Sequence, residues 1–443
     1  MLRQYQSTYQ GQNFDGERYF ATGGLCYNKV IENNASNDTL ASPLGKSVYI
    51  KYNYQEVQEL TRLLSLFFYM RINNSSATES PTIHNPYALF EKIEVRINNK
   101  SEQLVFQRAE MIQKYNEYLL NSKDRTSLDY ELFKNTNLWS ESTTLAGLTV
   151  PVSSYLDVRI DLLAIMPDIF RNHVYGAGVA PFENLEITLY FSNDTSNADV
   201  MTEYVVSNTT VNAWSNSTIS FSNLKFVREI QYTNDRNLTH YTNLLTFSTF
   251  YKLYKTDVQS WNTPGTNYYL FRPSDDKYSK FNAIQGFSVM IRKSLTGTAF
   301  NQADACKYYA GPKYIGFEIK LNDVVLMDMT GSSKLHERIK YLMKYVNNRF
   351  DTNSPQELLT DSSNLNKYYL VGSTYIDMAN IKTEAPDAYA VAMAMSTENK
   401  GTRWEIKLTC ESSIGADVEI MIFFHVYAST PGLQAKLDYD YKV

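Results

Sequence analysis

The chain has 443 residues and a mass of 51.0 kDa, with a formal net charge of −5 and a sequence pI near 5.7. Its 43% hydrophobic and 20% charged residues exclude a wholly disordered chain, and at about 150 residues per domain the length suggests two or three domains. The mildly acidic balance counts against broad electrostatic binding to nucleic acid or to an anionic membrane, which needs a basic patch.

Aromatic residues are abundant, with 35 Tyr and 22 Phe set among many Asn, Ser and Thr. Aromatic side chains suit a pleated, half-buried surface, and Asn and Ser suit the turns between strands, so the composition predicts a large all-β protein. Cys26, Cys306 and Cys410 are too few for a disulfide framework or a four-thiolate metal site, which favours free thiols in a reducing compartment.

Residues 1–45 mix polar, glycine and aromatic residues without clear periodicity, which is typical of an extended arm that orders only against another surface. No apolar signal-peptide core follows Met1, and the longest apolar runs are far shorter than the roughly 20 residues that span a bilayer. We therefore expect a protein that stays in a cytoplasm. We interpret its Asn-x-Ser/Thr triplets as chance occurrences, for example at Asn34, Asn74, Asn216 and Asn237.

Short segments in which apolar and polar residues alternate follow the arm, and this alternation predicts β-strands. In the first half they cover 47–54, 60–73, 93–97, 156–162 and 185–191.

A polar stretch rich in Asn, Ser and Thr, over 192–217, interrupts the pattern and is the predicted boundary between two halves. Strands resume beyond it over 219–232, 244–254, 287–292, 314–321, 368–378, 404–409 and 418–427. Many short strands separated by turn signals favour sandwiches or barrels over βαβ units.

Two segments have helical spacing instead. Over 107–121 and over 333–347, apolar residues recur every three or four positions and form one apolar face, which predicts two amphipathic helices.

The contexts of these two helices match. FEKIEVRINN, from Phe90, precedes the first helix, and YIGFEIKLND, from Tyr314, precedes the second by about the same distance. The two halves also close with similar strand pairs, over 156–166 and 185–191 in the first and over 404–409 and 418–427 in the second. Two similarities in the same order predict a duplicated β domain of about 200 residues per copy.

With this duplication the sequence resembles the double jelly-roll major capsid proteins, the lineage of tectiviruses, adenoviruses, virophages and large nucleocytoplasmic DNA viruses. The segments that carry the resemblance are FEKIEVRINNKSEQLVFQRAEMIQKYNEYLL, LTVPVSSYLDVRIDLLAIMPDIF, GVAPFENLEITLYFSND and EIMIFFHVYASTPGLQAKLDYDY. The sequence lacks the Phe-Ser-Arg motif of the large eukaryotic viruses, which leaves the virus group open, a membrane-containing bacterial or archaeal virus included.

The resemblance implies an all-β fold of two tandem eight-stranded jelly rolls, each with one flanking α-helix. The expected limits are an N-terminal arm over 1–45, a first jelly roll over 46–200, a linker region over 201–217, and a second jelly roll with the C-terminal tail over 218–443.

It further implies a structural function. We expect a viral major capsid protein that self-assembles into pseudo-hexameric homotrimers, which tile an icosahedral shell built in the host cell and kept in the virion. Expected partners are other copies of the chain, penton and minor capsid proteins, and an internal lipid membrane reached through the N-terminal arm, without sequence-specific nucleic acid binding.

No phosphate-binding loop, dinucleotide fingerprint, HExxH, GxSxG or EF-hand pattern occurs. We therefore predict no catalytic, cofactor-binding or metal-binding residues, no cofactor and no enzymatic activity. Among the histidines, which are too far apart for a local metal motif, His425 is interpreted as a strand residue and His336 as a solvated helix residue; the others are His84, His173 and His240.

Some charged residues are of the types that acid–base catalysis or Ca²⁺ binding requires. Asp157 with Asp161, and Asp438 with Asp440, are carboxylate pairs, and we interpret them as solvated strand or tail charges. The second helix carries charges that predict a solvated face, with a basic face toward genome or lipid headgroups as the alternative: Lys334, Glu337, Arg338, Lys340 and Lys344.

Two other function classes stay open at this stage. A carbohydrate-binding β-sandwich or attachment protein would use the same aromatic-rich fold. A jelly-roll glycoside hydrolase would need two carboxylates about 5 to 10 Å apart in one cleft.

Overall fold

A computed structural model of the chain describes nineteen stretches of it, and every structural statement below refers to them. They are residues 26–53, 60–78, 81–83, 86–97, 103–109, 112–113, 148–166, 174–175, 184–191, 205–207, 218–233, 245–260, 263–271, 284–293, 315–321, 323–338, 374–377, 404–413 and 417–429.

Nearly all of the regular structure in these stretches is β-strand, which confirms the predicted all-β class. The first block contains β1 (Cys26–Asn34), β2 (Thr39–Leu40), β3 (Ser47–Asn53), β4 (Leu60–Asn74), β5 (Pro81–Ile83), β6 (Phe90–Ile97), β7 (Gln103–Gln107), β8 (Leu148–Thr149), β9 (Ser154–Asp161), β10 (Val174–Tyr175), β11 (Asn184–Phe191), β12 (Val205–Ser207) and β13 (Ile219–Thr233). The second block contains β14 (Leu245–Ser260), β15 (Asn267–Phe271), β16 (Ile284–Lys293), β17 (Ile315–Leu321), β18 (Val324–Asp328), β19 (Thr374–Asp377), β20 (Trp404–Cys410) and β21 (Asp417–Ser429).

Each block is built on two antiparallel sheets whose strands follow the same order. In the first block the orders are β1-β13-β4-β10 and β3-β11-β6-β7, with β2 and β9 added to the first sheet. In the second block they are β14-β21-β16-β19 and β15-β20-β17-β18. When the eight strands of these two sheet orders are numbered along the chain within each block, strands with the same number hold the same sheet position in both blocks. The topology therefore contains the duplication predicted from sequence.

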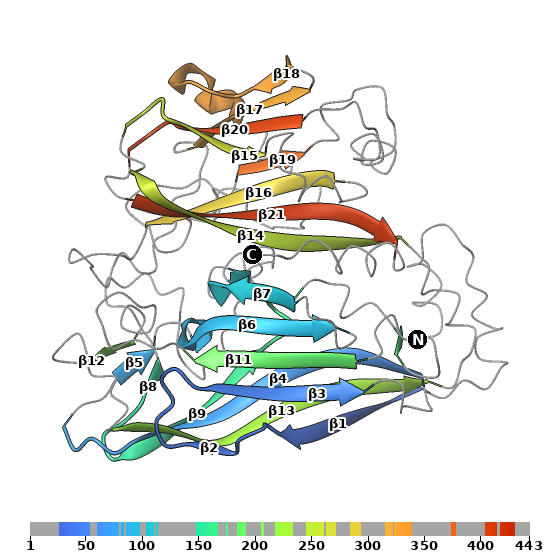
Figure 1. Ribbon diagram of the computed structural model, residues 1–443, viewed down its shortest axis with the longest axis vertical. Coiled ribbons are helices and arrows are strands. Elements are labelled where there is room, and N and C mark those ends of the chain that lie inside the picture. The colour runs from blue at the N-terminus through green and yellow to red at the C-terminus, as the bar shows by residue number, and fades with distance from the viewer. Residues whose placement is uncertain are drawn as a thin grey trace.

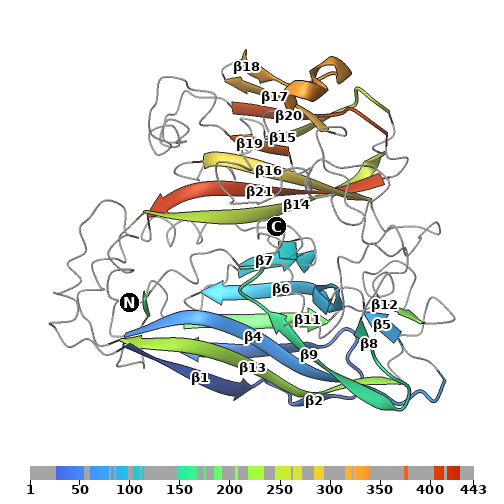
Figure 2. The same ribbon diagram turned by 180° about the vertical axis from the view of Figure 1, so that it is seen from behind.

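The two blocks are stacked along the long axis of the molecule (Figure 1). β7 is the first-block strand drawn nearest the second block, and β14 is the second-block strand drawn nearest the first; β18 lies at the far end, and β1 at the opposite one. The reverse view in Figure 2 has the same order. Both blocks therefore point the same way, head to tail.

An aromatic cluster fills the space between the two main sheets of the first block. Phe68 on β4 lies with its ring centroid 5.0 Å from that of Phe226 on β13 and 6.2 Å from that of Phe90 on β6. Phe191 on β11 lies 5.4 Å from Phe90. Because these side chains come from both sheets, they join the sheets into one core.

The strands bury alternate residues, as their sequence predicts. In β11, Leu185, Ile187, Leu189 and Phe191 are buried, whereas Glu186, Thr188 and Tyr190 are half-buried on the other face. Side chains of a strand point to opposite faces in turn, so one face enters the core and the other carries polar groups.

Strand pairing differs from the predicted domain limits at two places. β1 lies within the segment predicted to be an arm, and β13 lies within the segment assigned to the second jelly roll, yet the two pair with each other along their length, from Cys26 opposite Thr233 to Asn34 opposite Lys225. β13 also pairs with β4. Pairing between segments some 200 residues apart leaves no local pattern in a sequence.

The sequence comparison of the two closing strand pairs matched strands that do not hold the same place in their sheets. By sheet position, the counterparts of β20 and β21 are β11 and β13, whereas β9 is an addition beside β4. The match between FEKIEVRINN and YIGFEIKLND is confirmed, because β6 and β17 hold the same place in their sheets.

Helical residues occur within both segments predicted to be helices. Ala109, Ile112 and Gln113 are helical after β7, and residues 335–338 are helical after the short 3-10 turn η4 (Ser332–Lys334) that follows β18. The remainder of each helical segment lies outside the described residues. None of the helices in the described stretches is long and apolar enough to cross a membrane.

Candidate functional site

The end strand β18 exposes an apolar edge. Among the strands that the structure describes it pairs only with β17, and Val324 and Val325 at its start are 62% and 48% exposed. We call these two residues the β18 edge. Asp323, which precedes them in the hairpin, is exposed as well and has a φ of 66°, a left-handed conformation that Asp tolerates in a turn.

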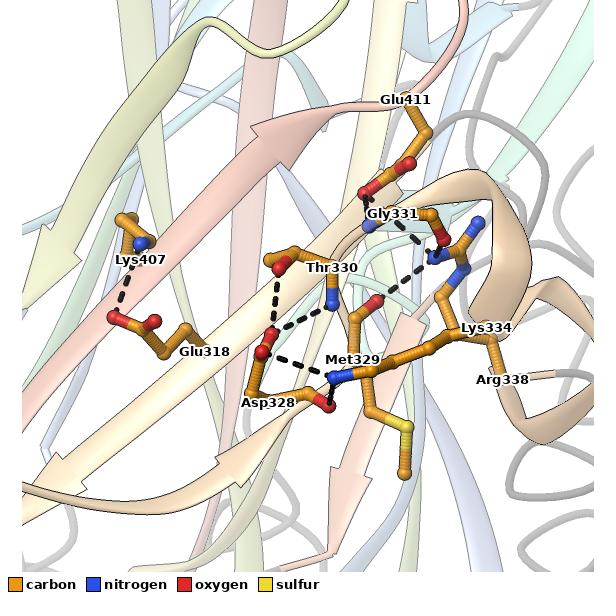
Figure 3. A network of polar contacts seen from close by, with 9 residues as sticks. All are labelled: Glu318, Asp328, Met329, Thr330, Gly331, Lys334, Arg338, Lys407 and Glu411. Atoms are coloured by element: carbon orange, nitrogen blue, oxygen red, sulfur yellow. Dashed lines mark hydrogen bonds and ion pairs between the residues drawn. The ribbon is translucent and has the colours of Figure 1, made fainter.

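A network of charged groups, which we call the clamp, fixes the chain just after this edge (Figure 3). The clamp consists of Asp328, Lys334, Arg338 and Glu411. Asp328 accepts hydrogen bonds from the backbone N–H and the hydroxyl of Thr330, and Lys334 Nζ lies 2.9 Å from its Oδ2. Lys334 Nζ also donates to the Asp328 carbonyl at 2.8 Å, which ties the first helical turn to the end of β18.

The buried half of the clamp is an ion pair between Arg338 and Glu411, whose side chains are 3% and 6% exposed. Arg338 donates to the carbonyls of Met329 and Gly331 at 2.8 and 2.7 Å, and its Nη1 lies 3.6 Å from Glu411 Oε1. Glu411 Oε1 in turn accepts the Gly331 N–H at 2.7 Å. The helix start is thus held to the end of β20.

Two glycines make room for this arrangement. A side chain at Gly316 on β17 would collide with the Glu411 carboxylate, which has no other place to go while it holds its two partners. Gly331 has a φ of 94°, which side-chain-bearing residues rarely adopt.

Burial and hydrogen bonding act against each other in the clamp. Burial by itself raises the pKa of Asp328, but hydrogen bonds from Thr330 and Lys334 outweigh it and bring the pKa down from 3.8 to about 2. Burial lowers the pKa of Arg338, while the charges of Glu411 and Glu337 oppose that change.

We predict that Asp328→Asn destabilises the protein by about 1 kcal/mol at pH 7, a value reduced by screening because the pair with Lys334 is partly exposed. Since the folded-state pKa is the lower one, the contribution of Asp328 is complete above about pH 4 and is lost as the pH falls toward 2. Thermal unfolding at pH 7 and near pH 2 measures this. Asp323→Asn, in the same hairpin, is the control, and an equal destabilisation at both pH values would contradict the prediction.

Glutamates at matching positions in the two blocks are also paired. Glu94 on β6 lies 2.7 Å from Lys92 Nζ and accepts the Tyr190 hydroxyl at 2.9 Å. Glu318 on β17, the fifth residue of the matching segment, lies 2.9 Å from Lys320 Nζ and 3.0 Å from Lys407 Nζ. Burial raises the pKa of Glu318, but these lysines lower it below its usual value. Both glutamates are therefore engaged by neighbouring polar side chains within their sheets.

These contacts position the backbone. Each carboxylate of the clamp is already engaged by a cation and by N–H or O–H donors, and no cluster of three metal-ligating side chains occurs within the described stretches. What the clamp supplies is a rigid end for β18.

The structure separates the carboxylate pair Asp157 and Asp161. Asp157 forms a two-pronged ion pair with Arg71 at 2.8 and 3.0 Å, and Asp161 accepts the backbone N–H of Leu163 at 2.9 Å. Four residues along a strand span about 13 Å, which is beyond the carboxylate spacing of a glycosidase.

The predicted solvated face of the second helix is wrong for Arg338, which is buried. Lys334 is half-buried and paired, whereas His336 and Glu337 are exposed as expected. The sequence analysis did not find Glu411 and Gly316, because no local pattern links residues on β17, after β20 and in the helix. The one available signal was that Glu411 directly follows the strand that became β20.

His425 lies within β21, in agreement with the strand interpretation. Asn74 is buried and donates to the carbonyl of Pro151 at 3.2 Å, which supports reading its triplet as chance. Several other residues weighed from sequence fall outside the described stretches: His84, His173, His240, Cys306, Lys340, Lys344, Asp438 and Asp440.

Cys410 is a buried free thiol, and burial, with the nearby Glu411 charge, raises its pKa to about 11. We predict that Cys410 stays unmodified by a water-soluble maleimide at pH 7.5 in the folded protein and reacts within minutes in urea, because the thiolate is the reactive form. Peptide mass spectrometry of the labelled protein measures this, and rapid labelling without denaturant would contradict it.

In comparisons with known proteins, no family model and no curated protein matches the chain. Among solved structures, a chain from the cryo-EM structure of the Sputnik virophage matches with a TM-score of 0.50 and 11% identity over 90% of this chain and 86% of that one. This likeness, together with the repeated strand order, decides the fold. The protein has the double jelly-roll fold.

Two other solved structures match over comparable lengths. The Faustovirus major capsid protein is 8% identical, with a TM-score of 0.47 over 92% of this chain and 90% of its own. The mavirus major capsid protein is 9% identical, with a TM-score of 0.41 over 89% and 86%.

Proposed function

We propose that this double jelly-roll protein is a viral major capsid protein that acts by self-assembly and resides in the virion. The observation that carries the proposal is that one chain holds two β blocks of the same strand order, stacked head to tail along its long axis. Two similar outlines in one chain allow three chains to present six similar blocks, which gives a pseudo-hexagonal tile.

The assembly unit would be a homotrimer. A heterologous interface whose rotation closes after three copies makes a ring, whereas one that does not close makes a filament. Tiles of this kind pack side by side into an icosahedral shell. Penton and minor capsid proteins, and a membrane reached by the segment before β1, complete the proposed set of partners; sequence-specific nucleic acid binding is not among them.

We further propose revised limits for the two jelly rolls. The pairing of β1 with β13 supports a first jelly roll over 26–233, and the strands from β14 to β21 support a second one over 245–429. Each would comprise the eight strands of its two sheet paths and one flanking helix, which starts after β7 or after β18.

An enzymatic function is not proposed. Asp157, Glu94, Glu318 and Glu411 are each tied to a basic side chain, and none of them is poised as a proton donor or nucleophile. A carbohydrate-binding role would use exposed aromatic faces. The exposed Tyr155 has its ring covered by the Arg71 guanidinium at 4.0 Å, whereas Tyr49 is 52% exposed.

Light scattering on the purified protein tests the proposal. We expect a particle of three times the 51.0 kDa chain mass that persists on dilution, and electron microscopy of the native source should show it in an icosahedral shell. A stable monomer that binds glycans, or hydrolysis that is lost when a carboxylate is removed, would overturn the capsid function.

A further inference from the structure

We propose that β1 is a detachable strand. It separates from β13 while the rest of the first block stays folded, and the separation stops at the loop that follows β1. Release adds the nine residues of β1 to the segment before them, which extends the reach of that segment by roughly 30 Å. The release does not depend on the capsid function, whereas its use, a longer connection to the proposed internal membrane, rests on that function.

β1 contributes little to the core of the first block. It lies at the outer end of the molecule (Figures 1 and 2), and among the described strands it pairs only with β13. Of its side chains at positions 28–34, Ile31 and Asn33 are half-buried and the others are exposed. Segments with few buried apolar side chains are the ones that open locally. The end strand of the facing sheet, β3, differs because it buries three side chains, those of Val48, Ile50 and Tyr52.

The side-chain contacts between β1 and β13 lie mostly on the solvent side. Lys225 Nζ is 2.8 Å from Glu32 Oε2, and Asn28 Nδ2 donates to Glu229 Oε1 at 3.0 Å. Exposed contacts of this kind contribute little to stability. On the inner face, Asn33 Oδ1 is shielded from solvent and has no hydrogen-bond partner among the described residues. Its release into water satisfies this acceptor, which favours the detached state.

β13 keeps its place when β1 leaves. Its other edge pairs with β4, from Ile219 opposite Asn74 to Thr233 opposite Leu60. Phe226 on β13 also stays packed in the aromatic cluster between the two sheets. The first block therefore loses one end strand and retains its core.

The loop after β1 sets the limit of the separation. We call residues 35–38 the strap. The Ser36 N–H donates to the Tyr49 carbonyl at 3.0 Å, and Ser36 Oγ accepts the Tyr49 N–H at 3.2 Å, so the strap is tied to β3. The Ala35 N–H donates to the carbonyl of the fully buried Leu224 on β13 at 3.0 Å. Because the strap is bonded to both sheets, the chain from Ala35 onward stays anchored.

Hydrogen exchange of the purified wild-type protein measures the release. We expect the protected amides of β1 to exchange about 100-fold faster than those of β11, which is paired on both sides. The exchange of β1 should also be insensitive to urea below the unfolding midpoint, since a local opening exposes little surface. Exchange of β1 at the rate of β11, with the same urea dependence, would overturn the inference.

Trypsin provides a second measurement with a matched site. Lys29 on β1 and Lys51 on β3 both have exposed side chains on end strands. A protease needs a released backbone, so brief digestion of the folded protein should cut after Lys29 and leave Lys51 intact, as peptide mass spectrometry reads out. Equal resistance of the two sites would contradict a detachable β1.

A pair of substitutions tests the part played by Asn33. Asn33→Val removes the shielded acceptor and should slow the exchange of β1 about tenfold. Asn34→Val, on the exposed face of the same strand, is the control for β propensity and should change the rate by less than about twofold. Equal slowing by both substitutions would contradict the role of Asn33.

These measurements are independent of the capsid test. A monomeric chain in which Lys29 is cut and Lys51 is spared would reject the capsid function and leave the release of β1 standing. A stable trimer in which both sites resist trypsin would reject the release and leave the capsid function standing.

Discussion

Replacing Arg338 with methionine is expected to lower the free energy of unfolding by about 3–5 kcal/mol, because it leaves a buried carboxylate without its counter-charge. Glu411 would keep the Gly331 N–H as a partner, the Met329 carbonyl would lose the Arg338 donor, and the Gly331 carbonyl would keep the Lys334 N–H. Urea unfolding followed by circular dichroism measures the change. Hydrogen exchange at β18 should rise together with the loss of stability.

The second substitution in this pair separates charge from packing. Adding Glu411→Gln to Arg338→Met should recover part of the stability, since the double variant buries no unpaired charge. His336→Ala, on the exposed side of the same helical turn, is the control and should change stability by less than about 0.5 kcal/mol. Equal losses in the single and double variants would show that the ion pair contributes nothing specific.

Phe68→Ala should destabilise the first block by a comparable amount, about 3–5 kcal/mol, because it opens a cavity between two sheets. Phe68 is fully buried and its ring lies against Phe90, Phe191 and Phe226. The surrounding rings come from three other strands that are themselves paired, so they cannot move far enough to fill the space.

Phe67→Ala is the matched comparison, since Phe67 precedes Phe68 on β4 and points to the opposite face. Its ring carries the Arg159 guanidinium at 3.5 Å and is only half-buried, so we expect a loss of about 1 kcal/mol. Thermal unfolding of both variants measures the contrast. Similar losses for the two would mean that the core does not lie between these sheets.

The class of the fold followed from local patterns. Alternation in segments such as SVYIKYN and NLEITLYF predicts which residues are buried, because the period of a strand is a property of its own backbone. The two helical segments were readable for the same reason. The duplication could be recognised at β6 and β17, where both copies have the same alternating sequence. It was matched to the wrong strand at β9, an added strand beside β4 with a similar alternating sequence.

The domain limits and the clamp depended on contacts between distant segments. β1 and β13 become partners only when the chain closes a sheet, so the pairing of the apparent arm with the start of the apparent second half could not be assigned from the residues of either segment. Arg338 looked like any helix-surface cation, and its burial depends on Glu411 and on the missing side chain at Gly316.

The sequence by itself determined the β class, the alternation of buried residues in strands such as β3 and β11, and the presence of two related halves, since all three follow from short-range periodicity. Only the tertiary structure decided which distant strands pair and which charges are buried. Those features are set by the pairing of residues some 80 to 200 positions apart, and the free energy of such contacts leaves no trace in neighbouring residues.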